Sequence, residues 1–173
     1  LCDEVSLELE HRIYSQTKAV LGDGFQPRTG DPVIVDFVEN LRRLGRKDRQ
    51  GFYDYPEEGE KRLWPGLSEV YEPAPNQPGV EAVKRRLLYI QGVEAARCLE
   101  EGVILGSGDA DVASILGWGF PRYTGGVLSM VHTMGIETFV SGCVELMKSY
   151  GPRFDPPEIL REMAVSGETL FAA

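Results

Sequence analysis

Two acidic residues, Asp109 and Asp111, are the first candidates for metal chemistry in this 173-residue sequence. A calcium loop of the EF-hand type needs a third oxygen ligand two residues further on, followed directly by a glycine. The sequence has Ala113 and Ser114 at those places, so the pattern fails. We interpret Asp109 or Asp111 as a helix-capping residue, accepting backbone N–H bonds at the start of a short helix over 112–116.

Nucleophilic catalysis would require a cysteine beside a histidine, and the sequence has three cysteines and two histidines. The spacing permits Cys98 or Cys143 to meet His132 in the fold. The sequence shows no recognisable motif with a third residue that would orient this histidine. Two histidines and widely separated cysteines also make a poor zinc site. We therefore predict no catalytic residue and no metal site in this chain.

Two segments have the glycine content of nucleotide-binding loops, Gly106-Ser107-Gly108 and Gly117-Trp118-Gly119. A dinucleotide-binding turn needs three glycines in a fixed pattern, directly after a β-strand. Both segments lack the third glycine, and neither follows a predicted strand. We interpret the first as a loop and the second as a break between two helices, and we predict no cofactor-binding residue.

A basic run lies in the middle of the chain and consists of Arg42, Arg43, Arg46, Lys47 and Arg49. One interpretation is that these cations receive the phosphates of a ligand such as coenzyme A. The other is that they form a solvated helix end, where cations interact favourably with the helix dipole. We favour the second interpretation and keep the first open.

Composition limits the possible partners. The 18 basic and 27 acidic residues give a formal net charge of −9, and an acidic surface repels the phosphates of nucleic acids. No apolar run approaches the about 20 residues of a membrane helix. The N-terminal residues are acidic rather than basic, unlike a signal peptide, and the scattered cysteines fit a reducing compartment. We expect a cytoplasmic protein with no nucleic-acid partner and no membrane span.

Hydrophobic periodicity predicts a mainly α-helical chain with one small β-hairpin. In the first part, apolar spacing indicates helices over 5–21 and 34–44, and alternating aromatic residues indicate a hairpin at about 51–64. Closely spaced prolines then mark a linker. We divide the chain into a first helical unit, 1–72, a proline-rich linker, 73–79, and a second helical unit, 80–173.

The second unit begins with a long predicted helix from about 80 to 102. After the short helix at 112–116, the glycines at 117–119 end it. Two helical segments then lie on either side of Gly135, and a last short helix starts at Pro156-Pro157 and ends before Gly167.

The two units repeat each other weakly. The segment 21–27 is similar to 150–156, and each stands at the end of one amphipathic helix and before another. Tandem units of this kind would pack as a pseudo-twofold pair in which each covers the apolar face of the other. The first unit is incomplete, because it has no counterpart of the helix at 80–102.

Strings of residues in both units resemble the C-terminal helical part of 3-hydroxyacyl-CoA dehydrogenases. In the first unit these are Gly45-Arg46-Lys47, Gly51-Phe52-Tyr53-Asp54-Tyr55 and, similar to an extension in the large multienzymes, Leu63-Trp64-Pro65-Gly66-Leu67. In the second unit they are Arg86-Leu87-Leu88, Glu94-Ala95-Ala96, Cys98-Leu99-Glu100-Glu101-Gly102-Val103, Asp109-Ala110-Asp111, Gly117-Trp118-Gly119-Phe120-Pro121, Thr124-Gly125-Gly126 and Tyr150-Gly151-Pro152-Arg153-Phe154-Asp155-Pro156-Pro157. The second unit looks like the second C-terminal helical repeat of the multifunctional fatty-acid β-oxidation protein, alpha subunit type.

The resemblance implies a role in lipid metabolism as part of a longer enzyme. Members of the family are oxidoreductases that transfer a hydride between NAD and the 3-position of an acyl-CoA, and they use a histidine held by a glutamate. Those residues lie in a Rossmann domain, to which nothing in this sequence corresponds. The family also has an Asn-Arg pair at the start of the first helical unit, and Arg85-Arg86 occupies the matching place in the second. The resemblance therefore implies that the second unit is non-catalytic.

The implied role is to cover and orient an active site. NAD would bind the parent enzyme and not this chain. The implied partners are an N-terminal Rossmann domain of the same parent chain and the acyl-CoA substrate. Two further candidates are a thiolase subunit and a second copy in a homo-oligomer. The corner Gly119-Phe120-Pro121 is the candidate for a substrate-side contact.

A second hypothesis comes from a different class of protein. Here the chain is a stand-alone, non-catalytic helical module that self-associates or binds a protein or acyl-CoA partner. An open first unit would leave an exposed apolar patch, which favours oligomers.

Overall fold

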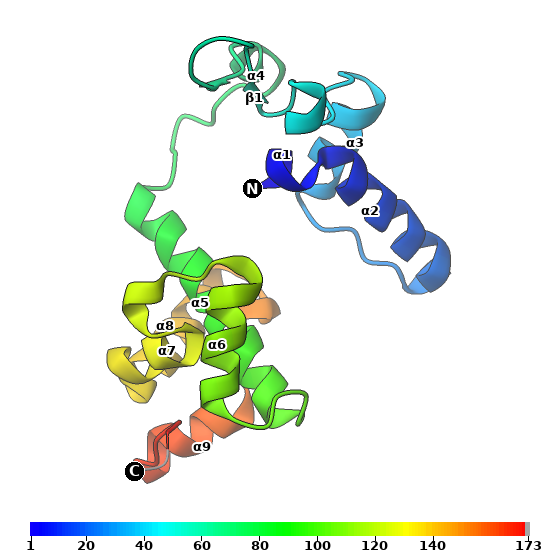
Figure 1. Cartoon of the computed structure of the whole chain (residues 1–173). Helices are drawn as coiled ribbons and strands as arrows, with labels where there is room; N and C mark the ends of the chain where they lie inside the picture. The colour runs from blue at the N-terminus through cyan, green and yellow to red at the C-terminus, as the bar shows by residue number, and fades with distance from the viewer. Residues whose placement is uncertain (172–173) are drawn as a thin grey trace. The chain divides into compact units, whose positions relative to one another are not determined.

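The computed structural model describes residues 1–171 (Figure 1). The chain divides into two compact units, Leu1–Gln77 and Pro78–Ala173, which we call unit 1 and unit 2. The described residues are mainly helical and include one small antiparallel hairpin. This confirms the predicted fold class.

Unit 1 begins with two helices where one was predicted. Its elements are α1 (Cys2–Val5), α2 (Leu7–Leu21), the 3₁₀ helix η1 (Gly22–Gly24), α3 (Asp31–Glu39), the 3₁₀ helix η2 (Arg46–Asp48), β1 (Tyr53–Asp54), β2 (Arg62–Leu63) and α4 (Leu67–Val70). The break lies at Ser6, whose φ of 92° no helix accommodates. The Leu7 N–H and the Ser6 hydroxyl both donate to the Leu44 carbonyl, which turns the chain there.

The helix predicted over 34–44 has different bounds in the structure. α3 starts earlier, with a proline in its first turn, and ends at Glu39. Arg42 then takes a left-handed conformation with φ of 54°, and the Arg43 N–H donates to the Phe37 carbonyl. The chain leaves the helix because the Arg43 side chain turns into the unit and is buried there.

The hairpin forms within the predicted range, with Tyr53 opposite Leu63. Its base packs on the core of unit 1, where the Phe37 and Phe52 ring centroids lie 4.3 Å apart and Trp64 meets Phe37 edge to face. The buried apolar residues of this core are Leu7, Phe37 and Val38.

Unit 2 is a helical bundle around the long helix α5. Its elements are α5 (Val80–Glu100), α6 (Ser107–Trp118), the 3₁₀ helix η3 (Arg122–Thr124), α7 (Val127–Met134), α8 (Ile136–Tyr150), the 3₁₀ helix η4 (Pro152–Phe154) and α9 (Glu158–Ser166). The predicted loop at 106–108 and short helix at 112–116 were wrong, because α6 starts at Ser107. Gly106 is extended and its carbonyl accepts the Ala110 N–H, so the first turn forms directly after it.

A glycine lets α5 approach its neighbours. A Cβ on Gly92 would lie 2.7 Å from the Phe139 ring and 3.0 Å from a Val131 methyl, so no larger residue fits. One turn earlier, the Tyr89 ring stacks on Phe139 with centroids 4.6 Å apart. Close packing of α5, α7 and α8 therefore forms the centre of the unit 2 core.

The helices of unit 1 correspond in order and length to the last helices of unit 2. α2 and α8 both have 15 residues, α3 and α9 both have 9, and a short 3₁₀ helix follows each of the 15-residue helices. The junction before α2 is Ser6, with φ 92° and ψ 121°, and the junction before α8 is Gly135, with φ 89° and ψ 126°. Within the described part of unit 1, no helix corresponds to α5.

Within residues 1–171 no single helix is both long and apolar enough to span a membrane. α7 and α8 together pass that test of length and composition, but the chain bends by 101° between them.

Candidate functional site

The predicted substrate-side corner lies at the C-terminal end of α6. Gly119 ends that helix in a left-handed conformation with φ of 75°, and the Phe120 N–H donates to the Ser114 carbonyl. The Phe120 side chain is buried in the unit 2 core, and Pro121 leads into η3. The apolar groups that this corner exposes are Trp118 and Tyr123. A substrate contact at residues 119–121 stays a prediction.

Asp111 organises the same corner from within α6. One carboxylate oxygen accepts the N–H groups of Leu128 and Ser129 at 2.7 and 3.1 Å, and the other accepts the Ser129 hydroxyl at 2.5 Å. A Cβ on Gly126 would lie 2.3 Å from the Asp111 Cβ, so only glycine fits there. The predicted capping role was right in kind but wrong in place, since Asp111 caps α7, which lies 16 residues further along the chain.

The cysteine–histidine pairs weighed from the sequence do not form among the described residues. Cys143 is fully buried, and burial raises the pKa of its thiol to about 12, which makes it a poor nucleophile. His132 meets the Phe171 ring edge to face, with centroids 5.5 Å apart. Residues 1–171 also contain no cluster of three His, Cys, Asp or Glu side chains that could hold a metal ion.

Unit 1 contains a histidine–glutamate pair that the sequence did not indicate. His11 Nε2 lies 3.1 Å from Glu39 Oε1 and links α2 to α3. The glutamate is exposed, and none of the grooves described below includes either residue. Because the two residues are 28 positions apart in the sequence, no short motif joins them. Its geometry is that of a surface contact between two helices.

The basic run serves different purposes along its length. Arg43 is buried, donates to the Gly51 carbonyl at 2.7 Å and to the Asp54 carboxylate at 2.5 Å, and its guanidinium stacks 4.2 Å from the centre of the Trp64 ring. Neither interpretation made from the sequence describes this residue. Arg43 holds the hairpin against the unit 1 core.

Asp3 holds the same hairpin from the other end of the unit. Its carboxylate accepts the N–H groups of Phe52 and Tyr53 at 2.8 and 2.9 Å and the Tyr55 hydroxyl at 3.0 Å. Burial, together with this bond, raises the pKa of Tyr55 to about 12. A Cβ on Gly51 would lie 2.4 Å from the same carboxylate. The segment at 51–55 that resembles the dehydrogenase pattern is therefore a structural unit.

Two of the remaining cations of the run form ion pairs. Arg46 donates to Glu4 at 2.6 Å, which lowers the pKa of that carboxyl, and Arg49 pairs with Glu57. Neither arginine lies within α3, so the helix-end interpretation was wrong for this part of the run. Their pairing offsets the positive charge of Arg46 and Arg49, which makes these two arginines weaker candidates for binding a phosphate.

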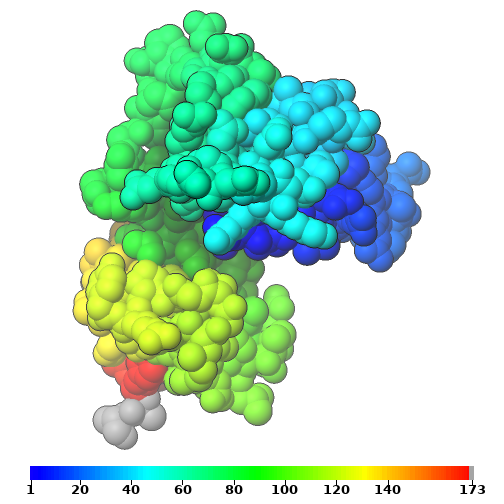
Figure 2. All heavy atoms as spheres, turned by 45° about the horizontal axis from the view of Figure 1, so that its top comes forward, coloured from blue at the N-terminus to red at the C-terminus, as the bar shows by residue number. Residues whose placement is uncertain are grey.

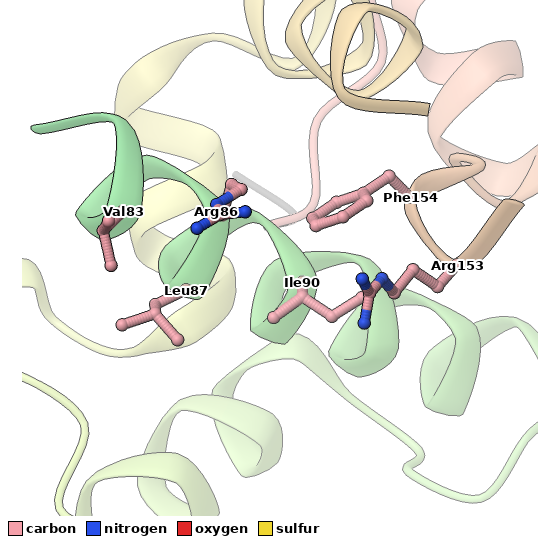
Figure 3. Close-up of a pocket in the computed structure, with 6 residues that line it drawn as sticks. All are labelled: Val83, Arg86, Leu87, Ile90, Arg153 and Phe154. Atoms are coloured by element: carbon pink, nitrogen blue, oxygen red, sulfur yellow. The ribbon is translucent and has the colours of Figure 1, made fainter. Parts of the chain in front are cut away.

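A groove on unit 2 lies between α5 and the η4 turn (Figure 3). Its volume is about 220 Å³, and its lining residues are Val83, Arg86, Leu87, Ile90, Arg153 and Phe154. Figure 3 shows the Phe154 ring facing the apolar side of α5, with one arginine contributed by each wall. Such a lining suits an anion with an apolar part. It contains no side chain for proton transfer or nucleophilic attack at neutral pH.

A second groove of about 260 Å³ lies between α5 and α6 and is almost wholly apolar. The half-buried Cys98 lines it, and Trp118 borders it, donating from Nε1 to the Gln91 side chain at 2.9 Å. Phe120 and its neighbours at 119 and 121 line neither groove. The structure thus separates Trp118, which faces this groove, from the three corner residues selected from the sequence.

A dinucleotide does not fit the glycine segments of this chain. Gly106-Ser107-Gly108 opens α6, and the Ser107 hydroxyl donates to the Leu170 carbonyl, so the helix start is covered. Gly117 lies inside α6 and Gly119 ends it. Neither segment follows a β-strand, which a dinucleotide-binding turn requires.

Comparison with known proteins gives a clear relationship. No family model matches the sequence. The chain is similar over 99% of its length to a protein named fatty acid oxidation complex subunit alpha, with 33% identity in Shewanella halifaxensis and 32% in both Shewanella loihica and Shewanella oneidensis.

The matched region is a small part of those relatives. The chain spans about a quarter of their length, 24% in each case. The similarity thus runs through both units, and the relatives that it joins to this chain are longer polypeptides.

Proposed function

We propose that this chain is the C-terminal helical part of an NAD-dependent 3-hydroxyacyl-CoA dehydrogenase in a cytoplasmic, multifunctional β-oxidation protein. The proposal is carried by one observation. Almost the whole chain is similar to a region that makes up about a quarter of the length of proteins named fatty acid oxidation complex subunit alpha. The strings of residues that resemble the dehydrogenase family lie inside this matched region.

The proposal includes a tandem repeat of one helical module. Its support is the agreement between the two units in helix length and in the dihedral angles at Ser6 and Gly135. A serine rarely adopts φ near 90°, whereas glycine does so freely. Such an unusual angle at matching junctions is what two copies of one backbone would produce.

In this role the chain supplies packing surface rather than acid–base chemistry. In the second unit, Arg85 occupies the place that matches the family's asparagine at the start of the first helical unit. Its guanidinium donates to Glu145 on α8 at 2.8 Å. That pair fastens α5 to α8 at the surface of unit 2. The helices would support a preceding NAD-binding domain, exclude water from the acyl-CoA substrate, and offer a surface to a thiolase subunit.

One observation favours the second candidate function, a self-associating helical module. Exposed apolar side chains line up along α2, namely Leu9, Ile13, Val20 and Leu21. Figure 2 shows the blue residues of this part of the chain at the surface of unit 1. Apolar rows of this kind mark interaction surfaces.

The first experiment is to sequence the coding DNA upstream of the Leu1 codon. We expect an open frame that continues into a strand, a Gly-x-Gly-x-x-Gly turn, and a later histidine and glutamate. A start signal within a few codons of Leu1 would refute the dehydrogenase proposal and favour the stand-alone module.

The second experiment uses the longer protein that this frame encodes. NADH formation from a 3-hydroxyacyl-CoA is followed before and after heating. Asp111→Ala is expected to shorten the half-life of the activity while leaving its initial rate unchanged, because Asp111 anchors α7. Asp109→Ala, in the exposed first turn of the same helix, is the matched control. Equal half-lives for both variants would contradict a supporting role of unit 2.

A further inference from the structure

The groove between α5 and the η4 turn, which we call the η4 groove, combines an apolar stripe with two basic side chains (Figure 3). Val83, Leu87 and Ile90 lie on one face of α5, where residues four and three positions apart are neighbours. The ends of this stripe, Val83 and Ile90, are seven positions apart, which is about 10 Å along a helix. Leu87 is 58% exposed, so the stripe has free apolar surface.

The two arginines of the η4 groove differ from other arginines of unit 2. Arg85, Arg97 and Arg161 each pair with a carboxylate. Arg86 and Arg153 form no ion pair within residues 1–171, and no acidic side chain belongs to the lining of the groove. The groove therefore carries positive charge that the described part of the chain does not offset.

Aromatic rings hold both of these guanidinium groups in place. The guanidinium carbon of Arg86 lies 4.5 Å from the centroid of the Tyr150 ring, and that of Arg153 lies 5.6 Å from the centroid of the Phe154 ring. A guanidinium that lies over a ring keeps the N–H groups at its edge available for a ligand. The two arginines are thus positioned before a ligand binds, which reduces the entropy that binding costs.

We propose that the η4 groove binds an amphiphilic carboxylate, in which a carboxylate ends an unbranched alkyl chain. Arg86 and Arg153 receive the carboxylate through their N–H groups, and the chain lies along the apolar stripe of α5. The net charge of −9 repels anions from most of the surface, so a ligand needs both this local positive charge and apolar contact. The proposal rests on unit 2 alone and requires neither the tandem repeat nor the dehydrogenase activity.

The lining of the groove favours an alkyl chain over a peptide with a free C-terminus. Apart from the two arginines, the lining side chains are Val83, Leu87, Ile90 and Phe154, none of which forms hydrogen bonds. The amide groups of a peptide would lose water there without gaining a partner, which is unfavourable. An alkyl chain has no such groups.

The groove between α5 and α6 provides a comparison within the same unit. It is almost wholly apolar, and its lining includes Glu94 and no basic side chain. It therefore has no group that receives a carboxylate, and Glu94 repels one. Trp118 borders this groove, so its indole N–H signal reports any ligand that enters there instead.

Titration of the ¹⁵N-labelled chain with octanoate, followed by NMR, tests the proposal. We expect saturable shifts of the backbone amides of Val83, Leu87 and Ile90, while the indole N–H signal of Trp118 stays in place. Octanol lacks the charge and butyrate lacks most of the chain, so each should bind at least tenfold more weakly. N-acetyl-leucyl-leucine, a peptide with a free carboxylate, should also bind at least tenfold more weakly.

Variants of the chain locate the carboxylate. Arg153→Leu is expected to weaken octanoate by at least tenfold and to change the affinity for octanol by less than twofold, because it removes a charge and keeps an apolar stem. The Arg153 side chain is exposed and forms no ion pair within residues 1–171, so its loss should not disturb the fold. Arg122→Leu, at an exposed arginine outside the groove lining, is the matched control and should leave octanoate binding unchanged.

A second pair of variants locates the alkyl chain. Leu87→Ser is expected to weaken octanoate by at least fivefold, since it removes apolar contact from the stripe. Leu116→Ser, at an exposed leucine of α6 outside the groove lining, should leave the affinity unchanged. Circular dichroism verifies that each variant is folded.

Four results would overturn the inference. A folded chain without saturable shifts would show that the groove has no such ligand, and binding that Arg153→Leu leaves unchanged would show that the arginines take no part. Shifts confined to Trp118 would place the ligand in the groove between α5 and α6. Equal binding of the dipeptide would assign the groove to the C-terminus of a protein. No NAD or coenzyme A takes part in these measurements, so the dehydrogenase proposal can fail or succeed separately.

Discussion

Replacement of Asp111 by alanine should destabilise unit 2 far more than the same change at Asp109. Asp111 is 5% exposed, and its carboxylate accepts three hydrogen bonds from the first turn of α7. Losing a charged acceptor and leaving buried N–H groups without a partner costs about 1.5–3 kcal/mol per group. With solvent compensating part of this, we expect a loss of about 3 kcal/mol. Asp109 is exposed, and its interaction with the helix dipole is worth at most about 1 kcal/mol.

Urea unfolding measures the difference between the two variants. Trp118 lies in unit 2, so its fluorescence reports on that unit when Trp64 in unit 1 is replaced by phenylalanine in every protein compared. With a slope of about 2 kcal/mol per molar urea, the Asp111→Ala midpoint should fall by about 1.5 M. The Asp109→Ala midpoint should fall by less than about 0.5 M. Equal shifts would refute the view that Asp111 anchors α7.

Three further predictions follow from buried groups. Arg43→Lys should lower the stability of unit 1 by about 2–3 kcal/mol, because lysine loses the stacking and the multiple bonds of a buried guanidinium; denaturant unfolding tests this, and an equal effect of the exposed Arg42→Lys would contradict it. Burial raises the pKa values of Tyr55 and Tyr71 to about 12, together with the hydrogen bonds that their hydroxyls donate to Asp3 and Asp36. Both neutral phenols therefore stabilise unit 1 fully below pH 10 and lose that effect as pH rises toward 12. Absorbance at 295 nm should show two of the seven tyrosines ionising late, and a single transition near pH 10 for all seven would contradict this. Burial of Cys143 predicts that Ellman's reagent at pH 8 modifies the other two cysteines first, whereas three equal rates would show that the core is open.

Local sequence signals sufficed for the fold class and for the hairpin. They failed where a tertiary contact overrides the helical pattern. The apolar spacing from 5 to 21 continues through Ser6, and only the two bonds to Leu44 explain why the chain turns there. Likewise, the apolar stripe from 34 to 44 runs past the end of α3, because the burial of Arg43 ends the helix early.

The contacts in the candidate sites that could not be predicted from the sequence join residues that are far apart in the chain. Asp3 lies about fifty positions from the hairpin N–H groups that it accepts, so no motif joins them. Asp109 and Asp111 have the same local setting, and only the fold distinguishes the exposed residue from the buried anchor. The groove arginines Arg86 and Arg153 come from α5 and η4 and were invisible as a pair.

The unequal cores of the two units have a consequence for cooperativity. Among the residues that the structure describes, the core of unit 1 contains three buried apolar residues and that of unit 2 contains seventeen. Since apolar burial supplies most of the driving force for folding, unit 1 should open first, as a separate step before unit 2 unfolds. Any molecule that binds only the folded form of unit 1 then raises the concentration of denaturant at which that step occurs. Such binding would also slow the exchange of the amide protons in α2, because they exchange when unit 1 opens. Slow exchange of these protons would therefore indicate that the exposed face of α2 is occupied in the cell.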